Sequence, residues 1–192
     1  MSRPTQIVLL DDQPAVRAGI RAVVSSEPDL QLVGAATGEA QLWTLLGPAR
    51  PDVVVLDLLH HGQIGLNLCL EIRRQPDPPA VVIYSESNES QVVVAAAIAG
   101  AAAVVGKESP TATLIEVIRA IARDPRTTPP VTLEMQRQAA GRLEADDLPI
   151  LSMRLAGEPA DEIGRVLGLS PAAMAVRLAR MVDRLKPTEM AG

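Results

Sequence analysis

Five short apolar runs recur along the first 123 residues, with amphipathic segments between them. The runs are Gln6–Leu10, Leu30–Ala35, Val53–Asp57, Ala80–Tyr84 and Ala102–Val105. Segments with helical spacing follow them, at Pro14–Ser26, Glu39–Leu46, Leu66–Arg73, Ser90–Ala99 and Thr111–Arg123. Because short apolar strands that alternate with helices are typical of parallel sheets, this pattern predicts an α/β fold with a doubly wound, five-stranded parallel sheet.

The pattern changes after Arg123. The segment Asp124–Pro130 holds three prolines in six residues, which forbid a continuous helix and are typical of a linker. Beyond it no strand-like run occurs, and helices are predicted at Leu133–Leu143, Asp146–Ala156, Pro159–Leu167 and Pro171–Leu185. We therefore expect a first domain over residues 1–123, a linker and connecting helix over 124–142, and a second, smaller all-α domain over 143–192.

Three carboxylates stand at the ends of two predicted strands. Asp11 and Asp12 follow the first run, and Asp57 ends the third. The carboxyl ends of the strands are where open α/β sheets bind ligands, and clustered carboxylates repel one another unless a cation lies among them. Hard oxygen ligands of this kind suit Mg²⁺. The sequence therefore predicts a magnesium site at this edge of the sheet.

A hydroxyl and an ammonium group follow the next two strands, at Ser85 and Lys107. A carboxylate can attack phosphorus as a nucleophile, while a metal ion and a lysine neutralise the charge that gathers on the phosphoryl oxygens. The five residues in this order form a phosphoryl-transfer constellation. Because it carries these five residues at the ends of its predicted strands, the segment of residues 5–123 resembles the receiver domain of two-component response regulators.

The resemblance implies a role for each residue and a flavodoxin-like fold. Asp57 would be the phosphoacceptor, Ser85 would bond a phosphoryl oxygen, and Lys107 would pair with the phosphate. The Mg²⁺ ligands would be Asp11, Asp12, Asp57 and the backbone carbonyl of Leu59. A sensor histidine kinase would be the phosphoryl donor, and a homodimer is one assembly that the resemblance suggests.

The sequence departs from the receiver pattern at two places. His60 and His61 stand where receivers usually carry Met-Pro, and we interpret them as loop surface, because adjacent residues seldom ligate one metal ion together. Val104 stands at the switch position, where receivers usually carry Tyr or Phe three residues before the lysine. A valine has no large ring to relocate, so we expect the aromatic half of the usual switch to be absent.

The stretch from Ala160 to Arg180 is similar to a helix-turn-helix, with a glycine in the tight turn and Ser170 as the N-cap of the second helix. Over residues 143–187 it resembles the output domains of NarL/LuxR-type regulators and also region four of alternative sigma factors. The resemblance implies that the second helix enters the major groove of DNA.

The start of this second helix, Pro171–Val176, offers no side-chain hydrogen-bond donor for a base or a phosphate. NarL-type proteins usually place lysines at the positions of Ala175 and Ala179. Arginines that share one helix face follow, at Arg177, Arg180 and Arg184. They predict either a stripe that contacts phosphates or a solvated helix face. If they bind DNA, we expect salt-dependent binding with little base reading.

Composition leaves two modes of output open. The 192 residues are 47% hydrophobic and 21% charged, which supports a core and argues against disorder. The net charge is −5, without the positive excess of an obvious nucleic-acid binder. The helical domain is therefore expected to bind DNA or, alternatively, a protein partner such as RNA polymerase, a sigma or anti-sigma factor, or another regulator.

A single cysteine, Cys69, fits a reducing compartment. No signal segment and no membrane-spanning apolar stretch is evident, so we expect a cytoplasmic protein. A phosphatase of the haloacid-dehalogenase type would also use an aspartate after an apolar strand, but Asp57-Leu-Leu59 lacks the second acid of its Asp-x-Asp motif. We therefore expect a response regulator that acts on transcription, and not an enzyme.

Overall fold

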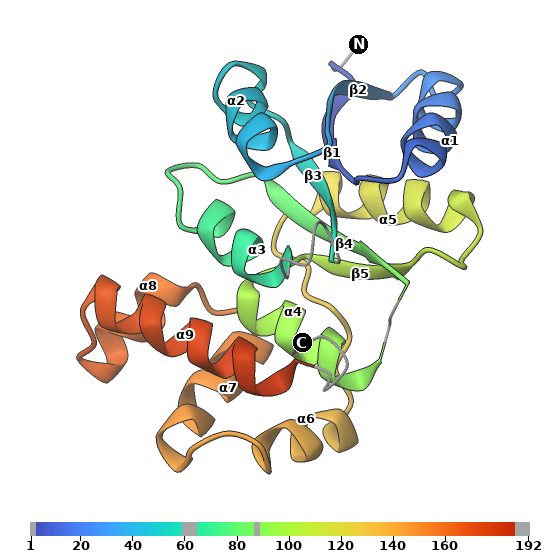
Figure 1. The fold of residues 1–192 in the computed structure, drawn as a ribbon. Helices are drawn as coiled ribbons and strands as arrows, with labels where there is room; N and C mark the ends of the chain where they lie inside the picture. Colours follow the sequence, from blue (N-terminus) through green and yellow to red (C-terminus); the bar gives the residue numbers. More distant parts are fainter. Residues whose placement is uncertain (1–2, 59–64, 87–88, 187–192) are drawn as a thin grey trace.

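The computed structural model describes residues 3–58, 65–86 and 89–186. Within these ranges five strands form one parallel sheet in the order β2-β1-β3-β4-β5, and Figure 1 shows helices on both sides of it. The strands are β1 (Thr5–Leu10), β2 (Leu30–Ala36), β3 (Val53–Asp57), β4 (Ala80–Ser85) and β5 (Ala103–Gly106). The predicted fold class, a doubly wound parallel sheet followed by an all-helical region, is confirmed.

Helices follow each of the strands. They are α1 (Pro14–Ser25), α2 (Glu39–Ala49), α3 (Gly65–Arg73), α4 (Ser90–Ala99) and α5 (Thr111–Arg123). The largest difference from the sequence prediction is at the end of α2, three residues beyond the expected Leu46. Pro48 lies in the last turn, and Arg50 ends the helix in the left-handed conformation with φ of 41°. The sequence favoured an earlier end because glycine and proline usually mark one.

The two faces of the sheet are covered by different helices. Ile7 and Leu9 pack with residues of α1 and α5, whereas Val8 and Leu10, which alternate with them along β1, pack with residues of α2, α3 and α4. Because both faces are buried, the strands are nearly continuous apolar runs. This is why the strands could be located from the sequence.

The described part of the C-terminal region is helical. Its elements are α6 (Leu133–Ala140), the 3₁₀ helix η2 (Ala145–Asp147), α7 (Leu148–Leu155), α8 (Ala160–Leu167) and α9 (Pro171–Leu185). The expected first helix ends three residues early, at Ala140, and the expected second helix is divided into η2 and α7. None of the described helices combines the length and apolar character that a membrane crossing needs.

Helices α8 and α9 form the expected helix-turn-helix. Gly168 ends α8 with φ of 67°, a conformation that glycine adopts without strain. Ser170 is the N-cap of α9, and its hydroxyl accepts a hydrogen bond from the backbone N–H of Ala173 over 3.2 Å. This bond satisfies one of the donors that a helix start leaves unpaired.

Helix α4 lies between the sheet and the C-terminal helices (Figure 1). It contacts α3 on the sheet side and α6, α7 and α9 on the other. Its residues from Val94 to Ala99 are all buried, as expected for a helix that is apolar all round. One hydrophobic cluster therefore runs from the sheet through α4 into α6–α9. The boundaries at residues 123 and 143 stay predictions, but the core is continuous across them.

Candidate functional site

The topology gathers the expected phosphoryl-transfer residues at the carboxyl edge of the sheet. Asp11 and Asp12 follow β1 directly, Asp57 is the last residue of β3, and Ser85 is the last residue of β4. Lys107 follows β5 directly. Because β3 lies between β1 and β4, Asp57 stands in the middle of this row. Parallel strands end at one edge, so each strand delivers its polar residue to the same place.

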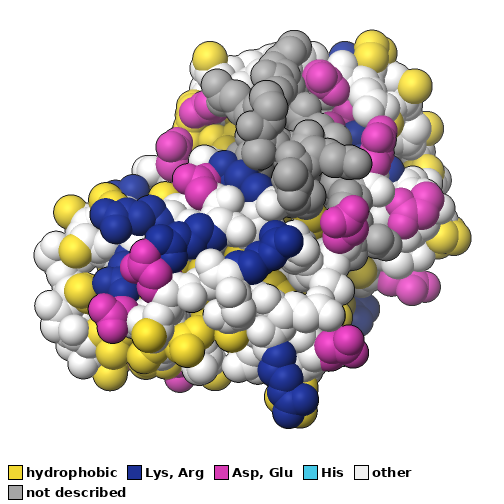
Figure 2. Space-filling model, turned by 60° about the horizontal axis from the view of Figure 1, so that its bottom comes forward, with side chains coloured by type: hydrophobic (Ala, Val, Ile, Leu, Met, Phe, Trp, Pro, Cys, Tyr) yellow, Lys and Arg dark blue, Asp and Glu magenta, His cyan; other side chains and the backbone are white. Residues whose placement is uncertain are grey.

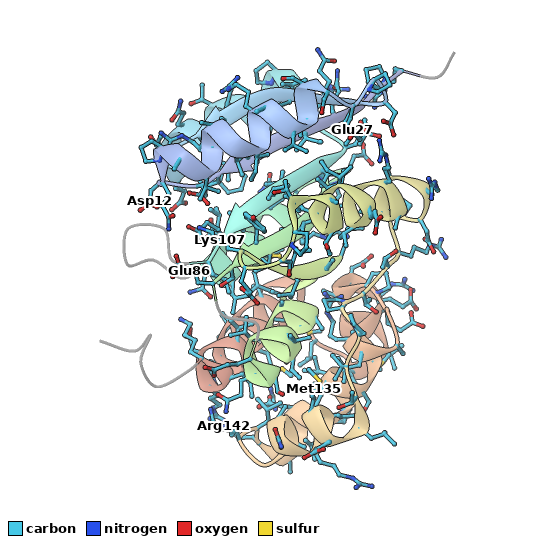
Figure 3. All side chains as sticks on the ribbon, turned by 90° about the vertical axis from the view of Figure 1, so that its right-hand side faces the viewer. Asp12, Glu27, Glu86, Lys107, Met135 and Arg142 are labelled. Atoms are coloured by element: carbon cyan, nitrogen blue, oxygen red, sulfur yellow. The ribbon has the colours of Figure 1, made fainter. Side chains whose placement is uncertain are left out.

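The carboxylates of Asp11, Asp12 and Asp57 lie close together. One oxygen from each lies within 4.8 Å of the others. Asp11 and Asp57 are buried, and Asp12 is partly buried. The Lys107 Nζ atom lies between the buried pair, 2.8 Å from Asp11 Oδ2 and 2.9 Å from Asp57 Oδ2. Figure 3 shows Asp12 and Lys107 at the same end of the sheet.

The charge balance of this cluster is negative. Burial by itself lowers the pKa of Lys107, but the hydrogen bonds to Asp11 and Asp57 outweigh it, so the pKa is raised and the lysine stays charged. Three carboxylates and one ammonium leave two formal negative charges. Hard carboxylate oxygens with this residual charge fit Mg²⁺, and Asp12, the least buried of the three, is the acid most open to it.

Backbone groups hold the site residues in position. The backbone N–H of Gln13 donates to Asp11 Oδ1 over 2.7 Å, and the N–H of Lys107 donates to the carbonyl of Ser85 over 2.7 Å. A side chain at Gly65 would place its Cβ 2.5 Å from the backbone oxygen of Asp57. Only glycine permits this close approach, a requirement that the sequence did not reveal.

A side-chain bridge that the sequence also did not reveal joins Gln13 to Glu86. Gln13 Nε2 donates to Glu86 Oε1 over 3.3 Å. Gln13 follows the β1 acids and Glu86 follows β4, whereas β3 lies between these two strands. The bridge therefore joins the two strand ends on either side of β3, the strand that ends in Asp57. Figure 3 shows Glu86 beside Lys107 at this edge.

The predicted switch position, Val104, lies on β5, and the aromatic ring near the site comes from β4. Val104 pairs with Ile83 and packs on the sheet face that α4 covers. Tyr84 packs on the opposite face, with α5, and its ring centroid lies 6.0 Å from Lys107 Nζ. Burial raises the pKa of Tyr84. The only tyrosine thus contacts the site lysine from β4, on the face away from α4.

Three predicted positions cannot be placed. Leu59, whose carbonyl was expected to bind Mg²⁺, and the loop residues His60 and His61 lie outside the described residues.

The arginines expected to contact DNA differ in their surroundings. Arg177 Nε donates to Asp147 Oδ1 over 2.6 Å, and Arg184 pairs with Glu144. Arg180 is exposed and has no ion pair with a described residue. In Figure 2, basic and acidic side chains are interspersed over the C-terminal helices. The arginine stripe is therefore partly neutralised by acids of the segment that contains η2.

Comparison with known proteins extends this assignment. The family model described as response regulator receiver domain matches residues 7–119. The chain is similar to the nitrate/nitrite response regulator protein NarL of Escherichia coli K12, with 26% identity over 95% of this chain and 90% of that protein.

Solved structures agree at the level of fold. A LuxR-family two-component response regulator from Aurantimonas sp. SI85-9A1 has 29% identity and a TM-score of 0.61 over 73% of this chain and 99% of that one. RcsB from Salmonella enterica serovar Typhimurium, bound to a promoter and beryllofluoride, has 18% identity and a TM-score of 0.64 over 98% of this chain and 96% of that one.

Proposed function

Since the chain belongs to the response regulator receiver family, we propose that it accepts a phosphoryl group on Asp57 from a sensor histidine kinase. The observation that carries this proposal is the position of Lys107 Nζ, shared between Asp11 and Asp57 at the end of the central strands. The buried Cys69 thiol fits the reducing cytoplasm, in which such a transfer would take place.

The residues divide the chemistry between them. An oxygen of Asp57 forms a bond to phosphorus as the phosphorus–nitrogen bond of the donor phosphohistidine breaks. Lys107 neutralises charge on the phosphoryl oxygens, and the Ser85 hydroxyl bonds one of them. Asp11, Asp12 and Asp57 would hold Mg²⁺, which supplies further charge neutralisation when bound. The phosphate adds roughly −1.5 to −2 charge at the edge of β3, which favours a closer approach of Ser85 and Lys107.

The C-terminal helix-turn-helix would carry the output to transcription by binding DNA. Arg180 would contact a DNA phosphate directly, because it is exposed. Arg177 and Arg184 would first have to break their ion pairs with Asp147 and Glu144. The helix start offers small apolar residues, whose base contacts are limited to thymine methyl groups. Binding would therefore be weak, salt-dependent and modestly selective, and a homodimer would double the number of phosphate contacts.

A protein partner is the second candidate for the output. Val166 and Val176, near the turn between α8 and α9, are 62% and 51% exposed. Exposed aliphatic side chains of this kind are more useful in a protein contact than in a phosphate contact. Together with the neutralised arginines, they favour this alternative.

Phosphorylation is tested with the full chain, Mg²⁺ and acetyl phosphate. We expect one phosphoryl group by intact mass on the wild-type protein and none on Asp57→Asn. Asp12→Ala should require more Mg²⁺ for the same labelling, because it loses a carboxylate ligand. Labelling of Asp57→Asn equal to that of the wild type would refute the assignment of the phosphoacceptor.

The output is tested by fluorescence anisotropy with genomic DNA fragments across a salt series, with and without beryllofluoride. DNA binding should weaken steeply with salt, and Arg180→Ala should lower the log–log slope by about one unit. Salt-independent, nanomolar binding would contradict contact through phosphates. No binding at low salt, with RNA polymerase or a sigma factor captured by the full chain, would favour the protein partner.

A further inference from the structure

Helix α4 is built for burial on every side. Only Ser90 at its start is exposed, and it carries no charged residue. A helix at the surface of a domain usually keeps one polar face. If the C-terminal helices moved away, α4 would present its valine, alanine and isoleucine side chains to water, a patch that soluble proteins seldom expose.

Helix α9 supplies much of this cover. Its contact with α4 is the most extensive between any two helices of the described chain. One stripe of α9 is fully buried, and its members are Met174, Leu178, Met181, Val182 and Leu185. On one flank of this stripe lie Ala175 and Ala179, both partly buried, and Ala179 packs against the hydrophobic cluster that includes α4.

The opposite flank of α9 faces the acidic segment of residues 144–147, which precedes α7. Arg177, on this flank, pairs with Asp147 of that segment. The two alanines therefore lie on the side of the stripe away from that segment. Helices approach each other most closely where the side chains between them are short. Alanine at position 179 is accordingly explained by packing, since α4 offers its own alanines, Ala95, Ala96 and Ala99, to the same cluster. Ala175 lies one turn earlier on the same flank and is also partly buried.

Arg154 of α7 binds the C-terminal end of α4. Its guanidinium donates from Nε to the carbonyl of Ile98 over 3.0 Å and from Nη2 to the carbonyl of Ala97 over 3.4 Å. These carbonyls belong to the last turn of α4, where a cation is favoured by the helix dipole. A Cβ at Gly100 would lie 2.6 Å from Arg154 Nη2, and Gly100 has φ of 90°, so this position is reserved for glycine.

We propose that the α4–α9 contact is a permanent part of the fold, and that the receiver and the C-terminal helices open only when the whole chain unfolds. Ala175 and Ala179 are then packing residues of this interface, and the flank of α9 that they form does not reach DNA. The phosphorylation state of Asp57 would move α4 and α9 together instead of separating them. The α4–α9 contact stays closed whichever partner the C-terminal helices bind.

Native-state hydrogen exchange of the full-length protein is the first test. Amides of α4 should exchange with the same free energy of opening as those of the central strand β3, both without ligand and with Mg²⁺ and beryllofluoride. Amides of α4 and α9 that exchange through a lower-energy opening than those of β3 would overturn the proposal, because separate opening units exchange independently. The measurement without ligand does not depend on phosphorylation, so a failure of the proposed phosphoacceptor would leave it intact.

Lysine substitutions on α9 are the second test. Ala175→Lys and Ala179→Lys should each lower the thermal midpoint by roughly 5 to 10 °C, because a charge enters a packed contact. Ala173→Lys adds the same charge to the same helix at an exposed position and should change it by less than about 2 °C. If the first two variants keep the wild-type midpoint and gain salt-dependent DNA binding, the flank is free in solution and the proposal is wrong.

Discussion

Arg177 donates a hydrogen bond from Nε to Asp147 Oδ1 over 2.6 Å, and it thereby ties α9 to the segment before α7. The side chain of Asp147 is 5% exposed and that of Arg177 is 26% exposed. Hydrogen bonding to Asp147 raises the pKa of Arg177. The other oxygen of the same carboxylate, Oδ2, accepts a hydrogen bond from the backbone N–H of Glu144. An arginine that the sequence suggests for DNA contact is therefore committed to the fold of its own domain.

Arg177→Ala should destabilise the protein by about 1 to 3 kcal/mol, because the buried Asp147 carboxylate loses its hydrogen-bonded cation and keeps only the longer ion pair with Arg184, at 3.7 Å. Arg180→Ala is the matched control, since Arg180 is exposed and has no ion pair with a described residue; its effect should stay within about 0.5 kcal/mol. Urea unfolding monitored by circular dichroism measures both. Equal stability of the two variants would show that the Arg177–Asp147 pair contributes nothing to folding.

The sheet and its functional edge could be predicted from the sequence. The reason is that β1, β3 and β4 are apolar and largely buried, and that each either ends in a polar residue or is directly followed by one. Alternation of strands and helices then fixes their order along the chain. The prediction that carboxylates, a hydroxyl and a lysine meet at one edge needs only this parallel topology.

Pairings between distant residues could not be predicted. Nothing in the sequence links Arg177 to Asp147 or Gln13 to Glu86, because each bond depends on how separate elements pack. Helix α4 did carry a signal, since a ten-residue helix without a charged face must be covered on all sides. The pattern does not say by what, and only the tertiary structure identifies α9.

Lys107→Gln should lower the free energy of unfolding without Mg²⁺ by about 3 kcal/mol or more, because it leaves two buried carboxylates, Asp11 and Asp57, without their cation. Mg²⁺ should restore more stability to this variant than it adds to the wild type, since the ion becomes their main counter-charge. Urea unfolding with and without Mg²⁺ tests both statements. Lys107→Gln/Asp57→Asn, which removes one of the acids, is the control and should recover part of the loss. A variant as stable as the wild type in the absence of Mg²⁺ would contradict the ion pairs.

Glu86→Ala should speed phosphorylation of Asp57 by acetyl phosphate, because it removes the Gln13–Glu86 bridge and so opens access to Asp57. The increase should be roughly two- to five-fold, because the bridge is a single exposed hydrogen bond of modest strength. Gln13→Ala should give the same change, although it alters no charge. Glu89→Ala removes an exposed acid that has no hydrogen bond with Gln13 and should leave the rate near that of the wild type. If all three variants match the wild type, the bridge does not restrict access to Asp57.

Cys69 should make the protein lose stability at alkaline pH. Burial raises the pKa of its thiol to about 12, and the thiol donates to the carbonyl of Ala99. In the unfolded chain the thiol ionises near pH 8.5. The stabilisation is therefore complete below about pH 8.5 and is lost as the pH rises from there towards about 12, at roughly 1.4 kcal/mol per pH unit.

Urea unfolding at pH 7.5 and at pH 10 should show the wild type losing about 2 kcal/mol more than Cys69→Ala over this interval. Tyrosine and lysine titrate in both proteins, so the comparison isolates the thiol. Parallel losses in the two proteins would mean that Cys69 is accessible enough to ionise in the folded state.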